Sequence, residues 1–161
     1  VNGRFSDPQK TIYELVLAAH QATLACIKPG AVFTDMQDAA VKVITQGLID
    51  IGLLTGELDK NIKDKTFRRF YMHNIGHWLG MDVHDVGAYK LEGESRPLLA
   101  GMVTTVEPGI YIDPDDMEIP PQWRGIGVRI EDNILVTDKG YRNLTEHLPV
   151  SVADIEILMA S

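Results

Sequence analysis

The amino-acid sequence predicts an α+β domain in which amphipathic helices pack on a β-sheet. Apolar residues recur at three- and four-residue spacing over residues 7–28 and 35–52, which is typical of helices with one buried face. Short apolar runs interrupted by proline and glycine follow at residues 102–107, 109–112 and 126–137, which is typical of strands. With 161 residues, 45% of them hydrophobic, the chain is long enough to form one domain with its own core.

Composition narrows the classes of function. The net charge is −8 and lysines and arginines form no run, which argues against nucleic-acid binding. No apolar run reaches the length of a membrane span, so we expect no membrane association. The single cysteine, Cys26, has no partner for an internal disulfide, which fits a reducing compartment and predicts a cytoplasmic location.

The first predicted helix spans residues 7–28, with Asp7 as its cap and Pro8 in its first turn. Its expected apolar stripe consists of Ile12, Leu15, Val16, Ala19, Ala22 and Cys26. Cys26 is expected to be a small core residue, and His20 to have a surface or packing role. Pro29 and Gly30 end the helix.

The second predicted helix spans residues 35–52 and begins with a capping box of Thr34 and Gln37. Residues 61–69 are polar and basic, and no regular element is expected there. The strand expected at 126–137 places Ile126, Val128 and Ile130 on one face and Gly127, Arg129 and Glu131 on the other. A short closing helix is expected over 152–159.

Three of the five histidines, His73, His77 and His84, fall within twelve residues. The spacing of the first two would place both on one helical face, but Asn74 stands where the zinc-protease helix motif requires glutamate. Nearby glycines, Gly76 among them, favour an irregular or strand-like path. A packing role is the alternative for any one histidine, and the three together favour a metal or catalytic site.

Two glutamates, Glu107 and Glu131, lie inside apolar, strand-like runs where an uncompensated carboxylate would be costly to bury. The bend predicted at Pro108 would aim Glu107 into a cleft. For Glu131 the alternative is a surface ion pair with Arg129, but its apolar neighbours indicate a sheet interior. We expect the remaining nearby acidic residues to be solvated loop carboxylates: Asp82, Asp85, Asp132 and Glu146.

One imidazole with several carboxylates is a hard, oxygen-dominated ligand set that suits Mn²⁺, with Zn²⁺, Co²⁺ or Fe²⁺ as alternatives. Two carboxylates that can each bridge predict a dinuclear site with metals about 3.5–4 Å apart and a shared hydroxide as nucleophile. The reaction class that follows is metal-assisted hydrolysis.

Three segments, HNIGHWLGMDVHDVG, GMVTTVEPGIYI and WRGIGVRIEDNILVT, together with Asn143-Leu144-Thr145, resemble the bacterial type of aminopeptidase P. This is the Xaa-Pro aminopeptidase branch of the pita-bread metallopeptidases. The resemblance implies a curved antiparallel sheet flanked by helices, and release of the N-terminal residue from peptides with proline at the second position. Prolidases carry similar motifs, but the run Trp123 to Gly127 favours aminopeptidase P.

By this resemblance, His77, Glu107 and Glu131 match metal ligands, with Glu131 bridging two Mn²⁺ ions in the complete site. Glu107 also matches the glutamate that takes the proton from the attacking water. His73 and His84 match the histidines that hold the substrate and stabilise the tetrahedral intermediate.

Arg129 matches an arginine that orients the ligand network. Asn74 stands where a glycine is common in the family, which should change loop stiffness rather than chemistry.

The family's other two metal ligands are aspartates, which would lie upstream of this chain, and Asp7 and Asp35 stand at helix starts where neither can replace them. The chain also begins near Asn2-Gly3, a hairpin-turn signal. We therefore expect residues 1–161 to be the C-terminal portion of one metallopeptidase catalytic domain, incomplete at its N-terminal side and inactive alone. Exposed sheet edges would then favour a homo-oligomer. The alternatives are a prolidase and a non-catalytic pita-bread module that binds proteins.

Overall fold

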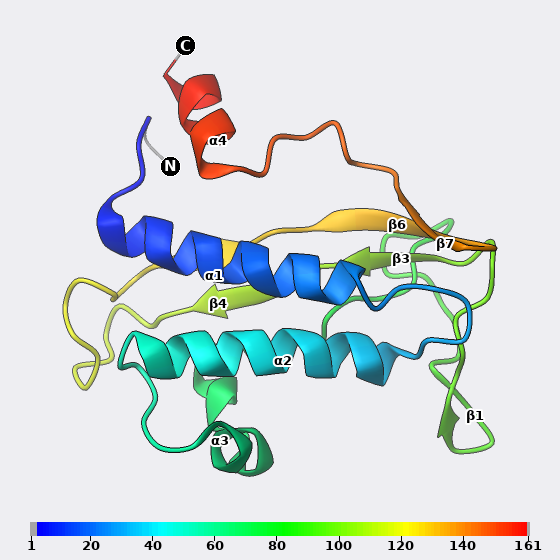
Figure 1. The fold of residues 1–161 in the computed structure, drawn as a ribbon, viewed down its shortest axis with the longest axis horizontal. Helices are drawn as coiled ribbons and strands as arrows, with labels where there is room; N and C mark the ends of the chain where they lie inside the picture. The colour runs from blue at the N-terminus through cyan, green and yellow to red at the C-terminus, as the bar shows by residue number, and fades with distance from the viewer. Residues whose placement is uncertain (1–2, 161) are drawn as a thin grey trace.

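Two long helices lie side by side and antiparallel in the computed structural model, which describes residues 3–160 (Figure 1). Helix α1 spans Asp7–Leu24 and helix α2 spans Phe33–Asp50. They approach closely at Gly47, where an added Cβ would lie 2.3 Å from Cδ1 of Leu15. The predicted apolar stripes are confirmed in outline, since fully buried residues, Ile12 among them, recur along one face of each helix.

The helix ends differ from the predictions because side chains just outside the apolar pattern supply the caps. Ser6, not Asp7, caps α1, and Ser6 and Gln9 form its capping box. In α2 the Asp35 carboxylate accepts the backbone N–H of Val32 at 3.0 Å, so the expected box of Thr34 and Gln37 is wrong. Helix α1 ends at Leu24, four residues before the predicted end.

Residues 58–69 form two short elements that the sequence did not predict. Helix α3 spans Leu58–Asp64, and the 3₁₀ helix η1 spans Thr66–Arg69. Lys65 joins them in the left-handed conformation, with φ of 56°. Phe67 is the buried apolar residue of this mostly polar segment, which packs beneath α2 (Figure 1).

The strands form two antiparallel ladders in succession along the same pair of chain segments. Strands β3 (Val103–Val106), β6 (Asp132–Thr137) and β7 (Gly140–Asn143) form one ladder, and β4 (Gly109–Tyr111) and β5 (Gly127–Arg129) form the other. A small hairpin consists of β1 (Lys90–Leu91) and β2 (Glu94–Ser95). The strand expected over 126–137 is therefore two strands.

The break between the ladders decides where the two glutamates lie. Val106 pairs with Asp132 on one side of the break, and Gly109 pairs with Arg129 on the other, so the register is the same across it. Continuing that register places Glu107 opposite Glu131. The ladders are interrupted here, although the Ile130 N–H still donates to the Pro108 carbonyl at 3.4 Å, and the two carboxylates lie on a common side.

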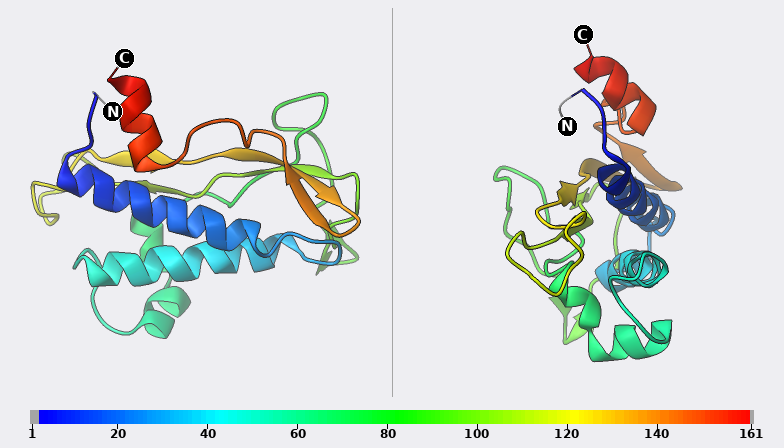
Figure 2. Two further views of the ribbon diagram at one scale, coloured as in Figure 1. Left: turned by 45° about the horizontal axis from the view of Figure 1, so that its top comes forward. Right: turned by 90° about the vertical axis from the view of Figure 1, so that its left-hand side faces the viewer.

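Helices α1 and α2 cover one face of the strands, and the core fills the space between these layers (Figure 2). Helix α4 spans Val152–Met159, as predicted, and lies beside the N-terminal part of α1 (Figure 1). None of the helices formed by residues 3–160 is long and apolar enough to cross a membrane. The turn expected at Asn2-Gly3 falls partly outside the described residues.

A buried polar pair joins α1 to β6 and corrects the expectation for Asp132. Nε2 of His20 lies 3.2 Å from Oδ2 of Asp132, and the two residues are only 2% and 4% exposed. The Thr145 hydroxyl hydrogen-bonds to Oδ1 of Asp132 and accepts the N–H of Asn133. Asp132 is therefore not a solvated loop carboxylate, because three segments converge on it.

This pair predicts a pH dependence of stability. Burial lowers the pKa of His20 below 6.5, and the nearby Asp132 carboxylate opposes this shift without cancelling it. As the pH falls below about 6.5, the unfolded chain takes up a proton at this site before the folded protein does. The free energy of unfolding should therefore decrease, and this part of the decrease should vanish in His20→Gln. Denaturant unfolding of both proteins at about pH 7.5 and about pH 5.5 measures it; parallel changes in the two proteins would contradict the prediction.

Candidate metal and active site

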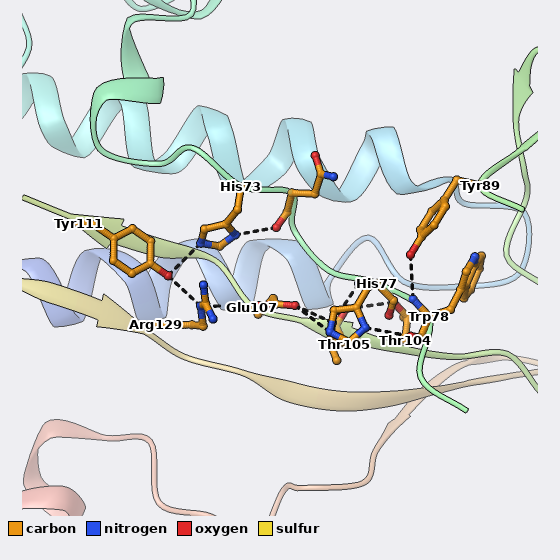
Figure 3. Close-up of polar contacts among 10 residues, drawn as sticks. His73, His77, Trp78, Tyr89, Thr104, Thr105, Glu107, Tyr111 and Arg129 are labelled. Atoms are coloured by element: carbon orange, nitrogen blue, oxygen red, sulfur yellow. Dashed lines mark hydrogen bonds and ion pairs between the residues drawn. The ribbon is translucent and has the colours of Figure 1, made fainter. Parts of the chain in front are cut away.

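Three side chains from three separate segments converge at the break in the strands. His77, Glu107 and Glu131 each offer a ligand atom, and these atoms all lie within 4.8 Å of one another. Nε2 of His77 is 3.3 Å from Oε1 of Glu107 (Figure 3). An imidazole nitrogen and carboxylate oxygens at such separations suit a divalent cation.

The burial of the two glutamates differs from the prediction in one respect. Glu107 is 9% exposed, as expected, whereas Glu131 is exposed. The apolar neighbours of Glu131 are indeed buried or half-buried, but Glu131 belongs to the alternate face, and the strand is interrupted at this residue. Its carboxylate therefore lies at the open side of the site, and the expected sheet interior is wrong for this side chain.

The segment that carries His77 runs along β3 as an irregular strand, as the glycines indicated. Trp78 forms an isolated antiparallel bridge with Thr104. The backbone N–H of His77 donates to the Thr105 hydroxyl at 3.0 Å, and the His77 carbonyl accepts from the Thr105 N–H at 3.0 Å and from the Thr104 hydroxyl at 2.9 Å. Both backbone groups of His77 are thus held by β3.

The tautomer of His77 follows from its hydrogen bond. Nδ1 lies 2.9 Å from the Trp78 carbonyl, which can only accept, so Nδ1 carries the proton. In the neutral ring Nε2 then carries the lone pair, and it lies 3.3 Å from Oε1 of Glu107. This is the arrangement of a histidine ready to ligate a metal through Nε2.

The two oxygens of the Glu107 carboxylate have different partners. Oε1 accepts the hydroxyl hydrogen of Thr105 at 3.0 Å. Oε2 lies 3.6 Å from Nε of Arg129, on the neighbouring strand β5. The carboxylate is therefore held from both sides while remaining next to His77.

A chain of hydrogen bonds connects Arg129 to His73 through Tyr111 (Figure 3). Nδ1 of His73 donates to the Asn74 carbonyl at 2.8 Å, so its Nε2 accepts from the Tyr111 hydroxyl at 2.9 Å. The same hydroxyl accepts from Nε of Arg129 at 2.8 Å. Gly109 makes room for this hydroxyl, since an added Cβ would lie 2.5 Å from it.

The electrostatics of Arg129 support this arrangement. Burial lowers the pKa of its guanidinium, but the hydrogen bond to Tyr111 and the nearby carboxylates of Glu107 and Glu131 more than offset that effect. The net shift is upward, so Arg129 remains a cation beside the two glutamates.

His84 lies on the exposed loop after His77, and its ring meets the His77 ring edge-on, with centroids 4.4 Å apart. It therefore borders the candidate site from the solvent side. The structure brings it next to a predicted ligand, and its role toward substrate stays a prediction. Asp82 and Glu146 are exposed, as expected, and Asp85 is half-buried.

Sequence reasoning missed three residues that organise this site: Thr105, Tyr111 and Gln37. Thr105 and Tyr111 flank Glu107 within one of the quoted motifs, so proximity in the sequence was an available signal for both. Gln37, assigned to a helix cap, instead accepts the N–H of Ile75 at 2.7 Å and holds the histidine segment against α2. No local pattern marks that contact.

Comparison with known proteins agrees with this geometry. Residues 1–138 match the model of metallopeptidase family M24. An Xaa-Pro aminopeptidase of Haemophilus influenzae is 51% identical over 99% of this chain, and one of Escherichia coli is 44% identical over the whole chain. In both cases the chain spans 36% of the relative's length.

Solved structures show the same fold. Pseudomonas aeruginosa aminopeptidase PepP superposes with a TM-score of 0.97 at 55% identity, covering 99% of this chain and 36% of that one. A zinc-substituted Escherichia coli aminopeptidase P in complex with product superposes with a TM-score of 0.93 at 44% identity, covering 98% and 36%. The expected pita-bread fold and the resemblance to aminopeptidase P are confirmed, and the chain belongs to metallopeptidase family M24.

Proposed function

We propose that this chain is the C-terminal portion of the catalytic domain of an Xaa-Pro aminopeptidase, which releases the N-terminal residue from peptides with proline at the second position. The observation that carries the proposal is the convergence of His77, Glu107 and Glu131 within 4.8 Å at the break in the strands. Relatives covering nearly the whole chain bear that activity in their names, and the motifs that contain these residues run through the matched region.

Membership of a metallopeptidase family implies use of a divalent metal. We propose that His77, Glu107 and Glu131 hold part of a two-ion site, with Glu131 bridging, and that Mn²⁺ is the natural metal. The donor set of one imidazole and two carboxylates supports a hard cation. The zinc-substituted relative indicates that Zn²⁺ can replace the natural ion in such a protein.

Bound metals would supply a water nucleophile of lowered pKa and would polarise the scissile carbonyl. Glu107 would accept the proton of the attacking water, a role that its burial, its hydrogen bond from Thr105 and the nearby cationic Arg129 support. His84, which borders the ligands, would donate a hydrogen bond to the substrate carbonyl as negative charge develops there. His73 would take the same role as an imidazolium, because the Nε2 of its neutral ring accepts from the Tyr111 hydroxyl.

The test uses the full-length protein. We expect manganese-dependent release of the first residue from an Xaa-Pro-Yaa tripeptide, and calorimetric titration should count two ions per chain. Cleavage of Xaa-Pro dipeptides in preference to tripeptides would identify a prolidase instead. Binding of peptide without hydrolysis, with the metal site loaded, would identify a non-catalytic module.

We further propose that the enzyme works in the cytoplasm and as a homo-oligomer. The single cysteine supports the first, and the outer edges of β5 and β7, with which no other strand of the described residues pairs, support the second. Sedimentation velocity of the full-length protein tests the oligomer; a strictly monomeric active species would contradict it.

A further inference from the structure

We propose that Thr105 is a positioning residue that fixes Glu107 relative to His77 through one hydroxyl group. This inference rests on the proposed function, because it concerns the geometry of that same site. Thr105 is 1% exposed and lies on β3, two residues before Glu107 and next to the segment that carries His77.

The Thr105 hydroxyl has two partners, and their chemistry fixes its orientation. The backbone N–H of His77 can only donate, so at 3.0 Å it bonds to a lone pair of the Thr105 oxygen. The single hydroxyl hydrogen is then available for Oε1 of Glu107, also at 3.0 Å. One atom thus links the backbone of one ligand to the carboxylate of another.

The bond also distinguishes the two oxygens of Glu107. Oε1 receives the Thr105 hydrogen and faces Nε2 of His77, whereas Oε2 faces Arg129. Without the hydroxyl, the carboxylate could rotate about its last torsion, which has a broad energy minimum. The ligand and the proton acceptor would then be less well oriented for a bound ion and its water.

Thr23 is a matched control outside the site. It is fully buried, like Thr105, and its hydroxyl donates to the Ala19 carbonyl at 2.9 Å within α1. Thr23→Val therefore removes a buried hydroxyl that bonds within its own helix, whereas Thr105→Val removes one that bonds to His77 and Glu107.

The experiment compares Thr105→Val, Thr105→Ser and Thr23→Val in the full-length enzyme. Valine keeps the shape of threonine and removes the hydroxyl, and serine keeps the hydroxyl. We measure kcat and KM on an Xaa-Pro-Yaa tripeptide, Mn²⁺ affinity by calorimetry, and melting temperature.

We expect Thr105→Val to reduce kcat and Mn²⁺ affinity by roughly 10–100-fold with little change in KM. Thr105→Ser should restore most of both, and Thr23→Val should retain them even where its melting temperature falls.

A Thr105→Val enzyme with kcat and Mn²⁺ affinity within twofold of the wild type would overturn the proposal. So would a Thr105→Ser enzyme as impaired as Thr105→Val. If Thr105→Val does not fold, Thr105→Ala takes its place in the comparison. Equal Mn²⁺ affinities of Thr105→Ala and Thr105→Ser would then overturn the proposal. Failure of the proposed function is distinguishable, because the wild type would then lack peptidase activity while the Mn²⁺ affinities of the variants still decide the role of Thr105.

Discussion

Replacing Glu131 with glutamine in the full-length enzyme is expected to abolish hydrolysis of an Xaa-Pro peptide. The carboxylate of Glu131 lies with His77 and Glu107 at the break in the strands, where it is proposed to bridge two ions. An amide has one neutral oxygen donor and cannot bridge in the same way. Losing several kcal/mol of transition-state stabilisation corresponds to about 10³-fold or more in rate.

The control for this prediction is Glu146→Gln, which removes the same charge from another exposed glutamate outside the site. Its kcat/KM should stay close to that of the wild type. Steady-state kinetics with added Mn²⁺ separate weak binding, which excess metal rescues, from loss of the bridge. Activity of Glu131→Gln within tenfold of the control would rule out the bridging role.

Replacing Gly76 with alanine is expected to destabilise the fold and disturb the site together. An added Cβ would lie 2.1 Å from the backbone oxygen of Thr105, so one backbone must move. Gly76 precedes His77 directly, and both backbone groups of His77 are bonded to β3. We expect the free energy of unfolding to fall by about 1–3 kcal/mol, the range for overpacking a filled interior, and Mn²⁺ affinity to fall with it.

Gly127→Ala is the matched control, since its Cβ would meet Cδ1 of Tyr111 at 3.6 Å, an ordinary contact. Urea unfolding and calorimetric Mn²⁺ titration of the two variants measure both effects. A Gly76→Ala protein as stable as Gly127→Ala, with unchanged metal affinity, would show that this close approach is not needed.

The helices illustrate which parts of the fold could be predicted. Their buried stripes follow from the periodicity of apolar residues, because an apolar helix face is buried regardless of which element packs on it. Their ends did not follow, since the caps depend on which polar side chain reaches the free N–H groups. Helix α3 and the 3₁₀ helix η1 were missed because they are short and mostly polar, with Phe67 as the buried anchor.

The site shows a similar division. Its residue types, including His77 and Glu107, were predictable because costly groups in apolar surroundings require partners. The exposure of Glu131 and the burial of Asp132 were predicted wrongly, although the residues are adjacent. Adjacent residues of a strand point to opposite faces, so Glu131 and Asp132 cannot both be buried under one layer. Helix α1 covers the face of Asp132, where His20 contacts its carboxylate.

By itself the sequence determined the chemistry of this protein: an imidazole, two glutamates and an arginine in motifs of one metallopeptidase family. Only the tertiary structure decided that Glu107 stands opposite Glu131, that one threonine hydroxyl links two ligands, and that Tyr111 joins Arg129 to His73. The physical reason is that residue type sets what a group can bind, whereas register and packing across distant segments set which groups meet.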